Sequence, residues 1–246
     1  MTVCHLIGNG PSAKLFDQRS GDVYGCNHPK LKLAYKACGF VDPGIPYWIY
    51  ATGHVGEWEW WTHEFLSNHI NDHELLSDVK GCFEFMPNAG AAMAKKLANM
   101  YDEVHLWGFD SLFSTSADSI TDGLHNRKVD IRQSHLPDWW KTVFEKDVAP
   151  LGNFICHIPT NIFSLNPVRG IQYVPTDPPD ESLEEFELFE FIAWHWHPLK
   201  YCYRYAVEDD EGVEWTCWYG DGKLVEKEKK RLEEEKDAEA QEVRDT

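Results

Sequence analysis

The chain has 246 residues, 43% of them apolar, and a formal net charge of −18. This length allows one large domain, or one domain with an appendage, around a substantial buried core. The charge argues against a sequence-independent grip on nucleic acid, because neutralising phosphates requires clustered lysine and arginine, and it leaves only an acidic mimic of DNA as a nucleic-acid-related role.

The seven cysteines are scattered and never occur as Cys-x-x-Cys, so neither a disulfide framework nor a cysteine zinc site is indicated. The N-terminus lacks the pattern of a signal peptide, and no apolar stretch reaches the length of a membrane span. His69 and His73 would share one helix face, but their surroundings offer no third ligand. We therefore expect a cytoplasmic protein with no membrane span and no metal site.

Strand-like and helix-like patterns alternate along the first two thirds of the chain. Because parallel strands need crossover helices, this alternation predicts an α/β fold with a doubly wound, mostly parallel, Rossmann-like sheet. A helix over 57–67 would carry Trp58, Trp61 and Phe65 along one side, at core spacing, although tryptophans can also line a sugar subsite. The predicted strands are 3–7, 23–26, 46–52, 81–87, 103–110 and 153–159, and the predicted helices are 57–67, 90–101 and 137–146.

The last third of the chain has a different character. Residues 175–185 are rich in proline and acidic residues, as in a linker or loop. Aromatic residues then alternate on both sides of a turn at 209–212, which predicts a β-hairpin over about 194–219. Glu and Lys spaced four apart predict a charged helical tail over 223–246. The expected domains are a Rossmann-like domain over 1–165 and a C-terminal appendage over 166–246.

A tight turn, Gly8-Asn9-Gly10-Pro11-Ser12, directly follows the first strand. In open α/β sheets this first strand-to-helix turn is the usual phosphate cradle. Gly8 and Gly10 allow positive φ and close backbone approach, Pro11 suits the first helical position, and exposed N–H groups attract an anion. A turn that only joins a strand to a helix fits the same pattern.

The second strand ends in Cys26-Asn27-His28, where a dinucleotide site normally carries Asp or Glu for the ribose hydroxyls. Asp22 stands at the opposite end of this strand, so NAD and flavins are disfavoured. Asn27 can instead exchange hydrogen bonds with a sugar or a base. An asparagine in a turn before Pro29 is the alternative interpretation.

Four stretches carry a resemblance to a known family: GNGPSAKLFD, DVYGCNHP, NAGAAMAKKLANMYDEVHLWGFD and SHLPDWWKTVFEKDV…NFICHIPTN. In this order they resemble the family-42 sialyltransferases, which transfer sialic acid from CMP-sialic acid to a sugar hydroxyl. Related phage and bacterial proteins, including pterin pyrophosphokinase-like ones, share the first motif. The resemblance covers about residues 1–165. It implies a GT-A-type, Rossmann-like nucleotide-binding domain and a metal-independent glycosyltransferase whose nucleotide-sugar donor is a co-substrate, with no further cofactor.

The resemblance also implies roles for individual residues. Asn9 and Gly10 would touch the phosphate and ribose, Asn27 the donor, and Asn88 and Gly90 the cytidine. The partners expected are a nucleotide or nucleotide-sugar and a saccharide or other hydroxyl acceptor. The predicted donor-binding residues are Gly8, Asn9, Gly10, Ser12, Asn27, Asn88, Gly90 and Asp110.

The general base of the family corresponds to His135 in QSHLPDWW. A histidine, with an unperturbed pKa of about 6.5, can remove a proton from the acceptor hydroxyl near neutral pH. The alternative for His135 is a helix cap or a packing role, and His125 is a further candidate for the base.

Residues 111–133 form a long segment rich in Ser, Thr, Asp and Gly, which predicts a lid. Its basic cluster can meet a phosphate or carboxylate when the lid closes, or balance neighbouring aspartates. The family places two tyrosines beyond Gly-x-Asp to hold the leaving phosphate, and this chain has no tyrosine there. The serines and threonine in their place are Ser111, Ser114, Thr115 and Ser116, and the basic cluster is Arg127, Lys128 and Arg132.

Two further hypotheses follow. The missing tyrosines favour a nucleotide-binding protein on the same fold without transfer activity. A pyrophosphokinase-like transferase is the third hypothesis, and it would need Mg²⁺ and carboxylates, for which Asp110 is the well-placed candidate.

Overall fold

A computed structural model describes residues 1–41, 45, 58–72, 79–84, 86, 88–114, 138–162, 165–186, 193–197, 202–208, 214–220 and 230.

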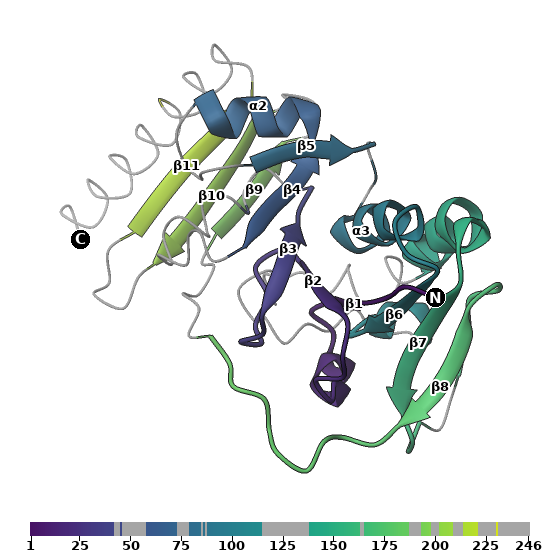
Figure 1. Ribbon diagram of the computed structural model, residues 1–246. Helices are drawn as coiled ribbons and strands as arrows, with labels where there is room; N and C mark the ends of the chain where they lie inside the picture. The colour runs from purple at the N-terminus through teal and green to yellow at the C-terminus, as the bar shows by residue number, and fades with distance from the viewer. Residues whose placement is uncertain are drawn as a thin grey trace.

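An eight-stranded, all-parallel sheet lies at the centre of the fold, in the order β5-β4-β3-β2-β1-β6-β7-β8 (Figure 1). The chain runs outward from β1 to β5, returns to β6 beside β1, and runs outward again to β8. The topological switch point therefore lies between β1 and β6, where open α/β sheets bind ligands. The strands are β1 (Val3–Ile7), β2 (Asp22–Cys26), β3 (Tyr35–Gly39), β4 (Glu59–His63), β5 (Val79–Phe83), β6 (Glu103–Trp107), β7 (Phe154–Pro159) and β8 (Gln172–Thr176).

Two hydrophobic cores lie on opposite faces of this sheet. In β1, Leu6 points into one core and Ile7 into the other, as strand periodicity requires. The first core is covered by α3 (Ala89–Ala98) and by the helical stretch 138–148, which Figure 1 shows side by side. The second is covered by the short 3₁₀ helix η1 (Pro11–Leu15) and by α2 (Glu64–Asp72). The predicted doubly wound, Rossmann-like α/β fold is confirmed.

Helix α3 is positioned by its first residues and by its small side chains. The Oδ1 atom of Asn88 accepts a hydrogen bond from the backbone N–H of Ala91 at 2.7 Å, which caps the helix. Its alanines allow close approach to the sheet, and a Cβ on Gly39 would overlap Met93. The N-terminus of α3 is therefore held at the edge where the parallel strands end, which is the carboxyl edge of the sheet.

The structure differs from the predicted elements in three strands. The sequence patterns do not predict β3, β4 or β8. Residues 59–63, predicted as helix, form β4, and the helix begins only at Glu64. Trp58 and Trp61 are buried, which confirms the predicted core positions, but they point into opposite cores and share no helix face. The predicted strand 46–52 lies outside the described residues.

The segment after β8 crosses the carboxyl edge to the other half of the sheet, passing η1 (Figure 1). The backbone of residues 184–186 pairs with that of residues 30–32 through an antiparallel bridge and two hydrogen bonds of 2.7 and 2.8 Å. Glu185 forms ion pairs with Lys14 at 2.6 Å and Lys30 at 3.7 Å. The Phe186 ring packs near His28, 5.8 Å away between ring centroids. Residues 177–186, called the strap below, are thus anchored at both ends.

A second sheet, antiparallel, contains β9 (Ala193–His197), β10 (Cys202–Glu208) and β11 (Glu214–Gly220) in the order β11-β10-β9. Strands β10 and β11 pair from Cys202 with Gly220 to Glu208 with Glu214, which confirms a hairpin around the predicted turn at 209–212. Strand β9 adds a third strand to this hairpin. The predicted helical tail 223–246 lies outside the described residues except for Lys230.

Within the described part of the chain, none of the helices combines the length and apolar character that crossing a bilayer requires. The cysteines whose side chains are described are free thiols: Cys4, Cys26, Cys38, Cys82 and Cys156.

Candidate functional site

The turns that follow β1 and β6 lie backbone against backbone at the switch point. The N–H of Gly8 donates to the carbonyl oxygen of Trp107 at 2.7 Å, and that of Gly10 donates to the carbonyl oxygen of Gly108 at 2.9 Å. A Cβ on Gly8 would lie 2.5 Å from the Gly108 oxygen, and Gly108 itself has φ +73°. The close approach of these two backbones thus explains why positions 8 and 10 are glycines. Neither Gly8 nor Gly10 adopts the positive φ that the sequence allowed for them.

The carboxylate of Asp110 occupies the N-terminus of η1. Its Oδ2 atom accepts hydrogen bonds from the backbone N–H of Ser12 at 3.0 Å and from the Ser12 hydroxyl at 2.7 Å. Pro11 opens the helix, as predicted. A Cβ on Gly10 would overlap this carboxylate. The turn does bind an anion, and that anion belongs to the protein itself.

Two asparagines connect this turn to the end of β2. The Nδ2 atom of Asn9 donates to the carbonyl oxygens of Cys26 at 3.1 Å and His28 at 3.4 Å. Between them Asn27 has φ +55°, and its N–H donates to Gly39 at 2.7 Å. The Oδ1 atom of Asn27 is buried and accepts no hydrogen bond from the described residues. A buried acceptor without a donor is rare, and an N–H or O–H group of a ligand would satisfy this one.

The start of α3 lies at the same edge. Asn88 caps this helix, and a Cβ on Gly90 would lie 2.9 Å from the Phe109 ring, which directly precedes Asp110. The structure therefore places all eight predicted donor-binding residues along the carboxyl edge of the sheet, around the switch point. His135, His125 and the basic cluster of the lid lie outside the described residues, and only residues 111–114 of the predicted lid are described.

Lys141 is a polar residue near this edge that the sequence analysis did not single out. The helical stretch 138–148 connects β6 to β7, so it begins toward the carboxyl edge, as α3 does. Lys141 lies one turn before Phe144, whose ring packs 6.4 Å from that of Phe109. Lys141 is only 8% exposed, and its Nζ has no hydrogen-bond partner among the described residues. Burial lowers the pKa of this ammonium group, an effect that nearby Asp138 opposes.

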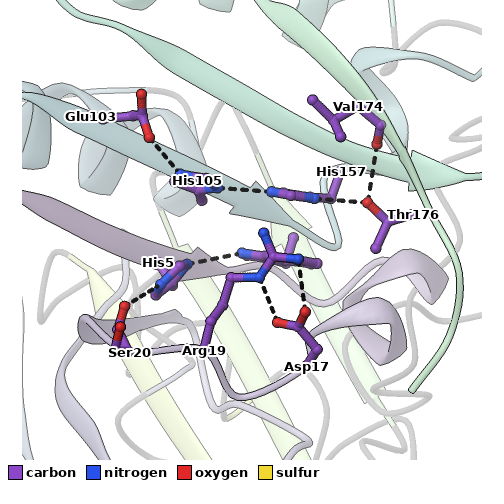
Figure 2. Close-up of polar contacts among 10 residues, drawn as sticks. His5, Asp17, Arg19, Ser20, Glu103, His105, His157, Val174 and Thr176 are labelled. Atoms are coloured by element: carbon purple, nitrogen blue, oxygen red, sulfur yellow. Dashed lines mark hydrogen bonds and ion pairs between the residues drawn. The ribbon is translucent and has the colours of Figure 1, made fainter. Parts of the chain in front are cut away.

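A second polar cluster crosses β6, β7 and β8 on the opposite face of the sheet from α3 (Figure 2). The Nε2 atom of His105 lies 2.7 Å from Glu103 Oε1, and its Nδ1 atom lies 2.8 Å from His157 Nε2. His157 Nδ1 lies 2.8 Å from the hydroxyl oxygen of Thr176, which is 3.2 Å from the carbonyl oxygen of Val174. These contacts form one unbroken chain, called the histidine chain below.

Aromatic and charged groups enclose the histidine chain. The His157 ring stacks on Trp107, with 3.5 Å between ring centroids and 4° between the planes. The Arg19 guanidinium lies 5.2 Å from the Trp107 ring centroid and pairs with Asp17. Burial, then the neighbouring His105 and Arg19, lower the pKa of His157 to about 3. His157 is therefore neutral in the folded protein at neutral pH.

His5, on the neighbouring strand β1, is also held neutral. The indole N–H of Trp107 donates to its Nδ1 at 3.3 Å, so the proton of the neutral ring is on Nε2, which donates to the carbonyl oxygen of Ser20 at 3.2 Å. Burial lowers the pKa of His5, although the bond to Ser20 acts in the opposite direction.

This cluster is not among the sites that the sequence patterns predict. Its signal is nevertheless present, because His5, His105 and His157 each stand at a position that alternates with buried apolar residues in a strand. What the sequence lacks is the register that brings His105 beside His5 and His157 beside Val174.

Models of protein families, curated proteins and solved structures give no match to this chain. Among the residues that the structure describes, no group of three histidine, cysteine or acidic side chains is arranged to hold a metal ion.

We expect Gly10→Ala to lower the free energy of unfolding by about 3 kcal/mol, because the new methyl group overlaps the Asp110 carboxylate and also lies 2.7 Å from the Gly108 oxygen. In an Asp110→Ala background the same substitution should be at least about 1 kcal/mol less destabilising. Gly8→Ala is the control, because its clash is with the backbone of Gly108 and remains in both backgrounds. Urea denaturation measures these differences. Equal effects of Gly10→Ala in the two backgrounds would contradict the packing described.

We also expect the stability of the protein to fall in acid because of His157. Its pKa is about 3 in the folded state and about 6.5 when unfolded, so the neutral ring stabilises the fold. This contribution is complete above pH 6.5 and is lost as the pH falls toward 3.

The variant His157→Gln removes this titration. Between pH 6 and 4 its free energy of unfolding should fall less steeply than that of the wild type, by about 1.4 kcal/mol per pH unit. Carboxylates titrate in both proteins, so the difference in slope isolates the imidazole. Identical slopes would show that His157 is not held neutral.

Proposed function

We propose that the carboxyl edge around Asn27 binds a nucleotide-activated sugar, CMP-linked as the family-42 resemblance implies, and that the chain transfers the sugar to a hydroxyl acceptor without a metal ion. The observation that carries this proposal is the buried Oδ1 atom of Asn27, for which the described part of the chain supplies no donor. It lies at the edge where the turn after β1, the turn after β2 and the start of α3 meet the switch point.

Asn27 supports a sugar or base ligand for a chemical reason. Its Oδ1 atom is an acceptor, so it requires an N–H or O–H donor, which ribose hydroxyls and the cytosine amino group carry. Its backbone is fixed in the left-handed region and its N–H is bonded to the Gly39 carbonyl oxygen, so the Cα that carries the side chain is held in place before a ligand arrives. A prepositioned acceptor binds with little loss of conformational entropy.

The phosphate of the donor needs a position other than η1, because Asp110 already fills that N-terminus. The start of α3 and Lys141 offer an alternative. The helix presents backbone N–H groups toward the carboxyl edge, and Lys141 carries a buried positive charge for which the described residues provide no partner. In the family the leaving phosphate is held by two tyrosines that this chain lacks, so we assign that role to Lys141.

Transfer requires a base for the acceptor hydroxyl, and the proposal keeps His135 in that role. Glycosyl transfer passes through an oxocarbenium-like state in which the phosphate departs as the hydroxyl loses its proton. A cation and helix N–H groups stabilise the departing phosphate, which is why the reaction does not depend on a metal ion.

The first test is binding of CMP without Mg²⁺, measured by thermal shift against CDP, UDP, GDP, ATP and NAD. CMP should raise the Tm most, since a ligand of the native state stabilises it by mass action. Asn27→Gly keeps the left-handed backbone and removes the amide, so CMP should bind at least about tenfold more weakly.

Gln18→Gly is the matched control, because Gln18 also has a positive φ, of 52°, and is exposed. This variant should bind CMP as the wild type does. Equal CMP affinity in both variants would overturn the Asn27 site. Preference for purine nucleotides with Mg²⁺ would favour the pyrophosphokinase-like alternative. If the wild type binds CMP but does not turn over CMP-sialic acid, the chain is a nucleotide-binding protein without transfer activity. If the wild type turns over CMP-sialic acid and His135→Ala binds CMP without turnover, the result supports transfer with His135 as the base.

Lys141→Met tests the phosphate position. The variant should bind CMP about 10 to 100-fold more weakly, because a hydrogen bond to a charged group is lost, while cytidine affinity stays unchanged. Its free energy of unfolding should not fall, since an unpaired buried charge destabilises the fold.

Lys146→Met on the exposed side of the same helical stretch is the control, and it should leave CMP affinity unchanged. An equal loss of CMP and cytidine affinity in Lys141→Met would show that Lys141 shapes the site without meeting the phosphate.

A further inference from the structure

While His157 stays neutral, as its lowered pKa requires, the histidine chain allows only two complete arrangements of its protons. Glu103 is a carboxylate and can only accept, so the Nε2 atom of His105 must donate to it. If His105 is neutral, its Nδ1 atom is an acceptor and His157 must donate from Nε2. His157 Nδ1 is then an acceptor too, and the Thr176 hydroxyl must donate to it.

The second arrangement contains one more proton. His105 then carries protons on both nitrogens and donates from Nδ1 to His157 Nε2. The neutral His157 has its proton on Nδ1 and donates to Thr176, whose own hydroxyl proton turns to the carbonyl oxygen of Val174 at 3.2 Å. The positive charge stays on the ring beside Glu103, whose other oxygen accepts from Asn153 at 3.2 Å.

We propose that Glu103, His105, His157 and Thr176 form a one-proton relay, in which the arrival of a single proton reverses the hydrogen bonds between strands β6, β7 and β8. A proton that reaches the Thr176 oxygen releases the original hydroxyl proton to His157 Nδ1. The Nε2 proton of His157 passes in turn to His105 Nδ1. Each proton moves along an existing contact, no ring rotates, and one proton enters for one positive charge gained.

The surroundings limit the relay to one additional proton. Facing the two rings are His5 from β1, Arg19 and Asp17 from the segment after η1, Glu103 from β6 and Thr176 from β8. A second proton would place N–H groups of His105 and His157 opposite each other beside the Arg19 charge. Of the two rings, only His105 contacts Glu103, so the additional charge is favoured on His105 and not on His157.

The relay gives the strap a proton-dependent anchor. Thr176 is the last residue of β8, and Asp177, the first residue of the strap, accepts a hydrogen bond from Thr160 at 2.7 Å. In one state the Thr176 hydroxyl donates to the ring in β7, and in the other it accepts from that ring and donates to the backbone of its own strand. This inference concerns the opposite face of the sheet and holds with or without a nucleotide ligand.

Imidazole ¹⁵N NMR across a pH titration of the full chain tests the relay. His157 should exchange its Nε2–H tautomer for the Nδ1–H tautomer at the same midpoint at which His105 gains its proton, and it should remain neutral throughout. A His157 that keeps one tautomer while His105 titrates, or that gains the second proton itself, would overturn the proposal.

Thr176→Val removes the hydroxyl that forms a hydrogen bond with His157 Nδ1 in both proton arrangements. In this variant the tautomer exchange of His157 should disappear or move about one pH unit lower, which is a tenfold higher proton concentration. Thr176→Ser should restore the wild-type behaviour. Thr160→Val is the matched control, because it removes a hydroxyl from the same strap junction without touching either ring. An exchange unaffected by Thr176→Val, or equally affected by Thr160→Val, would refute the relay.

Discussion

The contact between the turns after β1 and β6 is the constraint on which the rest of the structure depends. Two backbones cross at a distance that leaves no room for a Cβ on Gly8 or Gly10, and hydrogen bonds of 2.7 and 2.9 Å join them. This crossing sets β1 directly beside β6, which defines the switch point and divides the sheet into its two halves. It also brings Asp110 to the N-terminus of η1, where the carboxylate satisfies the N–H and hydroxyl of Ser12. Gly8 and Gly10 are therefore required, before any ligand is considered, because the two turns pack too closely for a side chain.

That constraint changes how the motif relates to ligands. A glycine turn before a helix usually predicts an open phosphate cradle, because free N–H groups attract an anion. Here the protein supplies the anion from the turn after β6, so a ligand phosphate at η1 would compete with Asp110. Two buried groups that have no partner among the residues of known position lie to either side, at Asn27 beyond β2 and at Lys141 on the helical stretch before β7. An acceptor and a cation at one edge of a sheet are complementary to a molecule that combines hydroxyl or amino donors with a phosphate. The proposal of a nucleotide-sugar ligand rests on this complementarity.

Much of the fold could be predicted from the sequence, because β1, β2, β6, β7 and α3 have clear apolar periodicity and are bounded by glycine, asparagine or proline. Strand β4 could not, since its consecutive tryptophans fit a helical spacing equally well, and only pairing with β3 places Trp60 and Trp61 in opposite cores. Strand β8 lies within a proline-containing stretch whose pairing with β7 is not encoded locally. The edge that gathers the predicted donor-binding residues was predictable from the fold class. The roles of Asp110 and of the histidine chain were not, because they depend on contacts between residues 50 to 100 positions apart in the chain.

The strap links the two polar regions of the molecule. It begins at Thr176, where the histidine chain ends, and it ends against residues 30–32, which follow the turn that carries Asn27. The protonated state of the relay has one more hydrogen bond than the neutral state, from Thr176 to Val174, and a charge-assisted contact between His105 and Glu103. The added bond lies within β8, at the point where the strap departs, and the contact between His105 and Glu103 lies within β6. The far end of the strap is fixed by the Glu185 ion pairs and the Phe186 packing, so one short stretch of backbone joins Thr176 to the segment beside Asn27.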